Sequence, residues 1–169
     1  MWCRPAWRKI ANHGQHSGNR RAPTWVEDRG GSGTPLLLLH GGLSNSDELL
    51  NSIGRGLSKS YRVVAFDRRG HGYTADTDAD FHYAGMAAET IGVLEKVVDG
   101  AAHLVGWSDG GVIALLVALQ RPDLVRKLVV IGTNFHSTAW SPWRWIPIRR
   151  WRRNWARHTS NAPLTGRGI

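Results

Sequence analysis

A serine set between glycines is the part of this chain whose residue types could do chemistry. The pentapeptide Gly106-Trp107-Ser108-Asp109-Gly110 follows a G-x-S-x-G pattern. Glycines two residues before and two residues after a serine permit a sharp turn that lifts the hydroxyl out of a sheet. A serine hydroxyl becomes a useful nucleophile only when a base takes its proton. The pattern predicts a nucleophile at Ser108, with an ordinary glycine-rich turn as the alternative.

The residues on either side place this pentapeptide between a strand and a helix. Residues 102–105 form a short apolar run, which is typical of a buried strand. Downstream, apolar residues recur at helical spacing until Arg121-Pro122 ends the run: Val112, Leu115, Leu116 and Leu119. A strand before the serine and a helix after it are the context that a nucleophile elbow needs.

Strand and helix patterns alternate over the middle of the chain. The predicted strands are residues 24–28, 36–39, 61–66 and 125–131. One helix is predicted to begin at Asn45, and another to be capped by Asp80. The alternation predicts an α/β fold with a mainly parallel sheet flanked by helices.

Charge divides the 169 residues into three segments. All 13 acidic residues lie between Glu27 and Asp123, so the charged residues of the two flanks are all basic. We therefore predict a basic, irregular N-terminal flank at residues 1–23 and one domain at residues 24–135. A Trp/Arg-rich C-terminal flank at residues 136–169 is predicted to be disordered, since it shows no clean apolar period.

Cysteine count and hydropathy bound the compartment. Cys3 is the single cysteine, so no internal disulfide forms and a reducing compartment is expected. No run approaches the ~18 apolar residues of a membrane span, and the first twenty residues lack the apolar core of a signal peptide. We predict a cytoplasmic chain without a metal or cofactor.

Three sequence blocks resemble the N-terminal half of the α/β-hydrolase superfamily, in its serine-hydrolase and esterase branch. They are LLLLHGG at residues 36–42, FDRRGHG at residues 66–72 and GWSDGG at residues 106–111. The last block is similar to the elbow of valacyclovir-hydrolase-like esterases. The resemblance covers roughly residues 24–135 and implies an incomplete α/β-hydrolase fold, truncated after about residue 135.

The resemblance also implies roles for individual residues. Ser108 becomes the nucleophile that forms an acyl-enzyme, and the backbone N–H groups of Gly42 and Asp109 become the oxyanion hole. His40 is expected to be structural, and His71 is not expected to act as the base because the motif places it in a loop.

Two carboxylates, those of Asp67 and Asp109, lie within these blocks. Asp67 is expected to pair locally with Arg69. The carboxylate of Asp109 favours either an amine-bearing substrate or a plain solvated position at a helix N-terminus, where the helix dipole stabilises an acid.

The triad acid and histidine of such an enzyme are not identifiable. The fold uses the order Ser, acid, His, but no Asp or Glu follows Asp123. His136 and His158 follow the serine, and neither stands in a strand–loop context. Loss of the base costs on the order of a millionfold in kcat. We therefore expect little activity from the chain alone on a small-molecule acyl substrate such as a carboxylic ester.

The flanks leave other functions open. Residues 139–157 hold five of the nine tryptophans and six arginines, so a non-catalytic membrane- or nucleic-acid-binding protein is the alternative. Pro142 and Pro147 interrupt this segment and no groove-reading motif accompanies it, so neither partner is favoured. Out-of-frame translation of the flanks, completion of the site by a partner chain and the oligomeric state also remain open.

Overall fold

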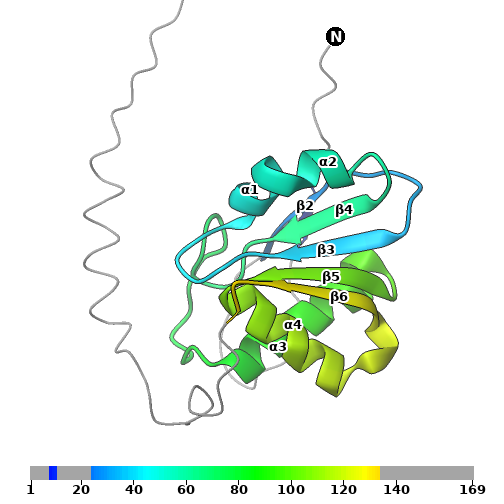
Figure 1. The fold of residues 1–169 in the computed structure, drawn as a ribbon. Helices are drawn as coiled ribbons and strands as arrows, with labels where there is room; N and C mark the ends of the chain where they lie inside the picture. Colours follow the sequence, from blue (N-terminus) through cyan, green and yellow to red (C-terminus); the bar gives the residue numbers. More distant parts are fainter. Residues whose placement is uncertain (1–7, 11–23, 134–169) are drawn as a thin grey trace, which may run out of the picture. The chain divides into compact units, whose positions relative to one another are not determined.

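The computed structural model describes residues 8–10 and 24–133, and these residues form one sheet with helices on both faces (Figure 1). The strands are β1 (Arg8–Ile10), β2 (Thr24–Asp28), β3 (Pro35–Leu39), β4 (Arg62–Phe66), β5 (Ala102–Trp107) and β6 (Val125–Ile131). The helices are α1 (Ser46–Leu49), α2 (Arg55–Leu57), α3 (Tyr83–Val93) and α4 (Asp109–Gln120). Shorter helical segments are η1 (Leu50–Gly54), η2 (Leu94–Val98) and η3 (Pro122–Leu124).

The sheet is mainly parallel, which confirms the predicted fold class. Its strand order is β1-β2-β4-β3-β5-β6. The pairs β4–β3, β3–β5 and β5–β6 are parallel, whereas β1–β2 and β2–β4 are antiparallel. Strand β1 falls within the N-terminal flank that was predicted to be irregular, so the structure adds a short strand there.

Strand β3 is apolar throughout, as expected of a parallel strand covered on both faces. Successive residues of β3 alternate between two apolar clusters, since side chains along a strand point to opposite faces. Leu37 and Leu39 pack with residues of α3 and α4, whereas Leu36 and Leu38 pack with Leu49 and its neighbours on the other face. The carboxyl ends of the parallel strands β4, β3 and β5 therefore open onto the same edge of the sheet.

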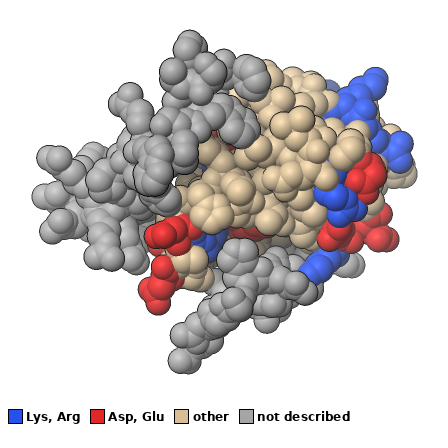
Figure 2. Space-filling view, turned by 90° about the horizontal axis from the view of Figure 1, so that it is seen from below, with Lys and Arg blue, Asp and Glu red and all other residues tan. Residues whose placement is uncertain are grey.

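Helix α4 is buried mainly through residues other than the large apolar ones that mark it in the sequence. Its buried residues are Ile113, Ala114 and Val117 together with two glycines, while Leu119 is 75% exposed. The helix is apolar on nearly every side, so the spacing of its large residues could not select the buried face. From the side of α3 and α4, the visible surface shows a broad uncharged area with charged side chains at its margins (Figure 2).

The two predicted helix starts have different outcomes. Asn45 caps α1 as predicted, because its side chain accepts a hydrogen bond from the Asp47 N–H at 3.1 Å. The prediction that Asp80 caps the next helix is wrong. His82 caps α3, where its ring nitrogen accepts from the Gly85 N–H at 2.9 Å. An imidazole nitrogen is a less common cap than a carboxylate, so the sequence pattern pointed to the nearer acid.

Among the described residues, no helix has the length and apolar character that crossing a bilayer requires. The predictions on residues 136–169, including disorder and binding through the Trp/Arg-rich segment, lie outside the described residues.

Candidate active site

Ser108 lies at the sharp turn between β5 and α4. Its backbone adopts φ 52° and ψ −117°, which residues with a side chain rarely adopt. The Ser108 N–H donates to the Ile131 carbonyl at 2.9 Å, and its own carbonyl accepts from the Gly111 N–H at 2.9 Å. The side chain is half-buried and does not cap α4. Ser108 is therefore not fully buried, and its hydroxyl does not cap the start of α4.

Two glycines allow this turn through close backbone contacts. A Cβ on Gly106 would overlap the Gly110 carbonyl oxygen and lie 2.6 Å from the Gly111 Cα. A Cβ on Gly110 would overlap the Leu39 carbonyl oxygen and lie 2.6 Å from the His40 carbonyl oxygen. Backbone atoms cannot rotate away as side chains can. The glycines of the G-x-S-x-G pattern therefore seat the start of α4 directly on the end of β3.

The Gly41-Gly42 loop after β3 lies against the same turn. A Cβ on Gly41 would come within 3.4 Å of the Ser108 Cβ and 2.9 Å of the Trp107 ring. A Cβ on Gly42 would overlap a carboxylate oxygen of Asp109 and lie 3.2 Å from its Cγ. Asp109 is the first residue of α4, so its N–H has no acceptor within the helix. The structure thus brings together all three site residues that the sequence predicts.

The carboxylate of Asp109 is hydrogen-bonded across the site. The Tyr83 hydroxyl donates to its Oδ1 at 2.8 Å. Burial and the Asp109 charge raise the pKa of Tyr83 to about 12, so this phenol keeps its proton at neutral pH. The pair ties the first residue of α3 to the first residue of α4. One oxygen of Asp109 thus has a partner in this chain and is not simply solvated.

Asp67 holds the loop after β4 through backbone groups. Its side chain is fully buried, and its two oxygens accept from the Ser46 N–H at 2.7 Å and the Tyr73 N–H at 2.9 Å. The prediction that Asp67 pairs with Arg69 is wrong, because Arg69 forms its ion pair with Asp76 at 2.7 Å. Backbone N–H groups occupy both oxygens of Asp67, whereas the guanidinium of Arg69 reaches Asp76 farther along the loop.

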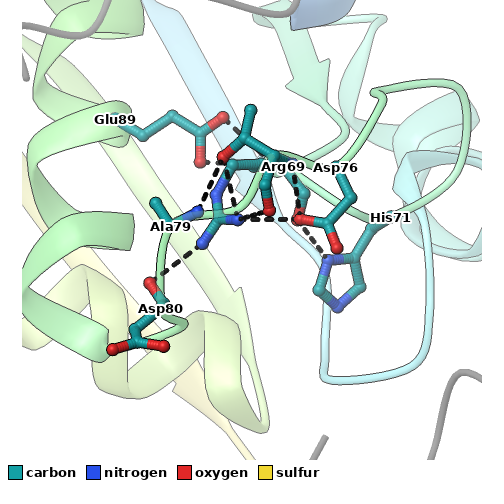
Figure 3. A network of polar contacts seen from close by, with 7 residues as sticks. Arg69, His71, Asp76, Ala79, Asp80 and Glu89 are labelled. Atoms are coloured by element: carbon teal, nitrogen blue, oxygen red, sulfur yellow. Dashed lines mark hydrogen bonds and ion pairs between the residues drawn. The ribbon is translucent and has the colours of Figure 1, made fainter. Parts of the chain in front are cut away.

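Arg69 is the centre of a polar network between this loop and α3 (Figure 3). Besides the Asp76 ion pair, its guanidinium donates to the Asp80 carbonyl at 3.0 Å and lies 4.0 Å from the centre of the Phe81 ring. Its backbone N–H donates to Glu89 at 3.2 Å. Burial raises the pKa of Glu89 to about 7. The network therefore fixes the loop after β4 to α3.

His40 and His71 are packed against each other as neutral rings. His40 is 1% exposed, with Nδ1 donating to the Gly41 carbonyl at 2.7 Å and Nε2 accepting from the Arg68 N–H at 3.2 Å. Burial, with a smaller effect of the Arg68 charge, lowers the pKa of His40 to about 2. The ring of His71 lies 5.0 Å away, and burial lowers its pKa as well. Within the described residues, neither ring hydrogen-bonds to Ser108.

We expect His40 to contribute a loss of stability as the pH falls below 6.5, the ordinary pKa of a histidine. The unfolded chain takes a proton at His40 there, whereas the folded chain does so only near its lowered pKa. The loss is about 1.4 kcal/mol for each pH unit. Urea unfolding at about pH 7 and about pH 5 should show a smaller loss for His40→Gln than for the parent chain. The raised pKa of Glu89 changes stability in the opposite direction, but it does so in both chains and cancels in the difference between them. Equal losses would contradict the prediction.

The described residues supply neither the acid nor the base of a triad. His136 and His158 lie outside them. Thr133 follows β6, and its hydroxyl lies 3.4 Å from the Ser108 carbonyl oxygen. Within the part of the chain that the structure describes, no group of three or more His, Cys, Asp or Glu could hold a metal ion.

Sequence reasoning missed two residues around the site, Arg68 and Tyr83. Arg68 is 1% exposed and its guanidinium donates to the carbonyls of His40 and Gly41. Tyr83 gave no signal, since its partner is 26 residues away.

Comparison with known proteins identifies the family. A family model described as alpha/beta hydrolase fold matches residues 34–164. The chain belongs to the α/β-hydrolase family. The matched range runs past residue 135 into the predicted C-terminal flank, and the domain boundary itself stays a prediction.

The chain spans less than half the length of the relatives that follow. It is 30% identical over 138 residues to the serine hydrolase BPHL of Mus musculus, covering 77% of this chain and 44% of that protein. It is 37% identical over 106 residues to 2-hydroxymuconate semialdehyde hydrolase of Pseudomonas sp. strain CF600, covering 61% and 38%. The solved esterase structure from Exiguobacterium antarcticum aligns with a TM-score of 0.60 at 32% identity, covering 66% and 42%.

Proposed function

We propose that this chain carries the nucleophile and the oxyanion hole of a serine hydrolase that cleaves a carboxylic ester or a similar acyl bond. The turn at Ser108 is the observation that carries the proposal. A strained conformation of this kind costs of order 1–3 kcal/mol. Joining a strand to a helix does not require it, whereas holding a hydroxyl out of the sheet beside Gly41-Gly42 does. The relatives named as serine hydrolase and esterase support the same chemistry.

The proposed reaction begins with attack of the Ser108 Oγ on the substrate carbonyl carbon. The hydroxyl proton passes to a base outside the described residues, and the carbonyl oxygen gains the negative charge. The N–H groups of Gly42 and Asp109 donate to that oxyanion, each contributing about 3 kcal/mol in the transition state. Collapse of the intermediate expels the alcohol and leaves an acyl-enzyme, which water then hydrolyses.

The same proposal predicts a low turnover for the chain alone. No Asp or Glu follows Asp123, so no acid stands in the usual order after the serine to orient a histidine. Deacylation needs a base as much as acylation does. A substrate with a good leaving group should therefore acylate the chain slowly and remain attached.

The test is the reaction of the folded chain with p-nitrophenyl acetate. We expect release of about one equivalent of p-nitrophenolate without sustained turnover, because only the first step proceeds. Peptide mass spectrometry should place the acetyl group on Ser108. Ser44→Ala is the matched control and should be acetylated like the parent chain. Ser44 also follows the Gly41-Gly42 loop, but its hydroxyl donates to the Glu48 carboxylate. Acetylation of another residue, or none in a folded chain, would refute the proposal.

A further inference from the structure

We propose that Arg68 is a positioning residue for the oxyanion hole, holding the two peptide groups that lead to Gly42 so that the Gly42 N–H faces the substrate oxygen. This inference rests on the proposed serine-hydrolase function. It concerns a residue of the loop after β4, which is not part of the elbow and does not touch the substrate.

The geometry follows from two hydrogen bonds of one guanidinium. Arg68 Nη1 donates to the His40 carbonyl at 2.5 Å, and Nη2 donates to the Gly41 carbonyl at 2.9 Å. In a planar trans peptide the carbonyl and the following N–H point in opposite directions. Drawing the Gly41 carbonyl toward Arg68 therefore turns the Gly42 N–H away from Arg68. Asp109 lies next to Gly42 there, beside the nucleophile.

The loops after β3 and β4 are also joined in the reverse direction. The Arg68 N–H donates to the His40 ring at 3.2 Å, while the Arg68 side chain donates to the His40 carbonyl. Each of the two side chains thus binds the backbone of the other residue. Hydrogen bonds to a peptide carbonyl polarise that peptide and strengthen its N–H as a donor. The clamp therefore both orients the Gly42 N–H and improves it.

A structural tie alone does not require a buried cation. Arg68 is 1% exposed, and among the described residues no carboxylate lies within ion-pair distance of it. Its Nε is buried without a hydrogen-bond partner in the same part of the chain. Burying a charge without a direct partner is costly. Burial accordingly lowers the pKa of Arg68 to about 10.

The charge becomes useful when a negative oxygen forms nearby. The carboxylate of Asp109 lies beside Gly42, where it would repel an oxyanion. Asp109 is also the acid whose field acts most strongly on Arg68. A buried cation behind the loop offsets this repulsion, and low dielectric surroundings strengthen the effect. Arg68 therefore allows an acid to stand next to the nucleophile without weakening the oxyanion hole.

Arg68→Met and Arg68→Lys test the proposal, with Arg62→Met as the matched control. Arg62 also donates to two backbone carbonyls, those of Val98 at 3.2 Å and Val97 at 3.1 Å, but at the opposite end of β4. The first readout needs no activity and is the amide proton and nitrogen NMR resonance of Gly42 in the folded chain. The second is the rate of the p-nitrophenyl acetate burst.

We expect Arg68→Met to shift the Gly42 amide resonance and to slow the burst roughly 10- to 100-fold, somewhat less than the loss of a whole oxyanion donor. Arg68→Lys keeps the charge but cannot fork to both carbonyls, so it should give smaller changes in both readouts. Arg62→Met should change neither. If Arg68→Met does not fold, Arg68→Lys decides by the same readouts.

An unchanged Gly42 resonance in the Arg68 variants would overturn the proposal, even if Ser108 is acylated normally. A shifted resonance with a burst rate equal to that of the parent would also overturn it, because the clamp would then have no effect on the oxyanion hole. If the resonance shifts but no chain is acylated, the parent included, the proposed function fails while the clamp on the Gly42 amide is supported.

Discussion

Replacing Ser108 by glycine is expected to abolish acylation and to stabilise the fold at the same time. Glycine reaches φ 52° and ψ −117° without the clash that a Cβ makes there. The substitution should relieve about 1–3 kcal/mol of backbone strain, and the greater freedom of glycine in the unfolded chain offsets part of this gain. We expect a net gain of about 1 kcal/mol in the free energy of unfolding, measured in urea. The p-nitrophenolate burst should disappear.

Asp99→Gly is the control for this double effect. Asp99 is an exposed residue at the end of η2, and like Ser108 it has a positive φ, with φ 61° and ψ 50°. Glycine at such a position should also add up to about 1 kcal/mol of stability. It should leave the burst unchanged. If Ser108→Gly is less stable than the parent, the strain is not present; if it is still acylated at the parent rate, Ser108 is not the nucleophile.

The elbow could be predicted from the sequence because the residues that form the turn are close together in the chain. The turn depends on residues within five positions of one another, and each glycine is required by a backbone contact. The strands could also be predicted from the sequence. The apolar run at residues 36–39, for example, has the composition of a strand covered on both faces. Features that depend on local backbone geometry can therefore be predicted from residues that are adjacent in the sequence.

The remainder of the site depends on side chains that meet from separate loops. Arg68 reaches a carbonyl 28 residues away, and Asp67 accepts from an N–H 21 residues away. Residue type alone does not reveal such partners, which is why Asp67 was assigned to its neighbour Arg69. The buried face of α4 could not be selected from the sequence for a different reason. Its small residues face the sheet because the backbones approach closely there, whereas a periodicity argument gives most weight to large residues.

Substituting Gly110 and Gly56 by alanine is expected to change stability in opposite directions. Helix propensity favours alanine over glycine by about 1 kcal/mol at both positions, since both lie in helices. A Cβ at Gly56 meets nothing within 4 Å, so the gain should appear in full. A Cβ at Gly110 overlaps the Leu39 carbonyl oxygen. Overpacking against backbone should destabilise Gly110→Ala by about 3 kcal/mol.

The sign of the Gly110 effect distinguishes close seating of α4 from ordinary helix packing. Urea unfolding of the two variants and the parent measures it directly. If Gly110→Ala is stabilised like Gly56→Ala, the start of α4 does not rest on the end of β3. The Gly41-Gly42 loop would then stand farther from Ser108, and the two N–H groups would not meet at one oxygen. A loss confined to Gly110→Ala, together with a weaker burst, ties the stability of the turn to its chemistry, because both depend on the same backbone contact.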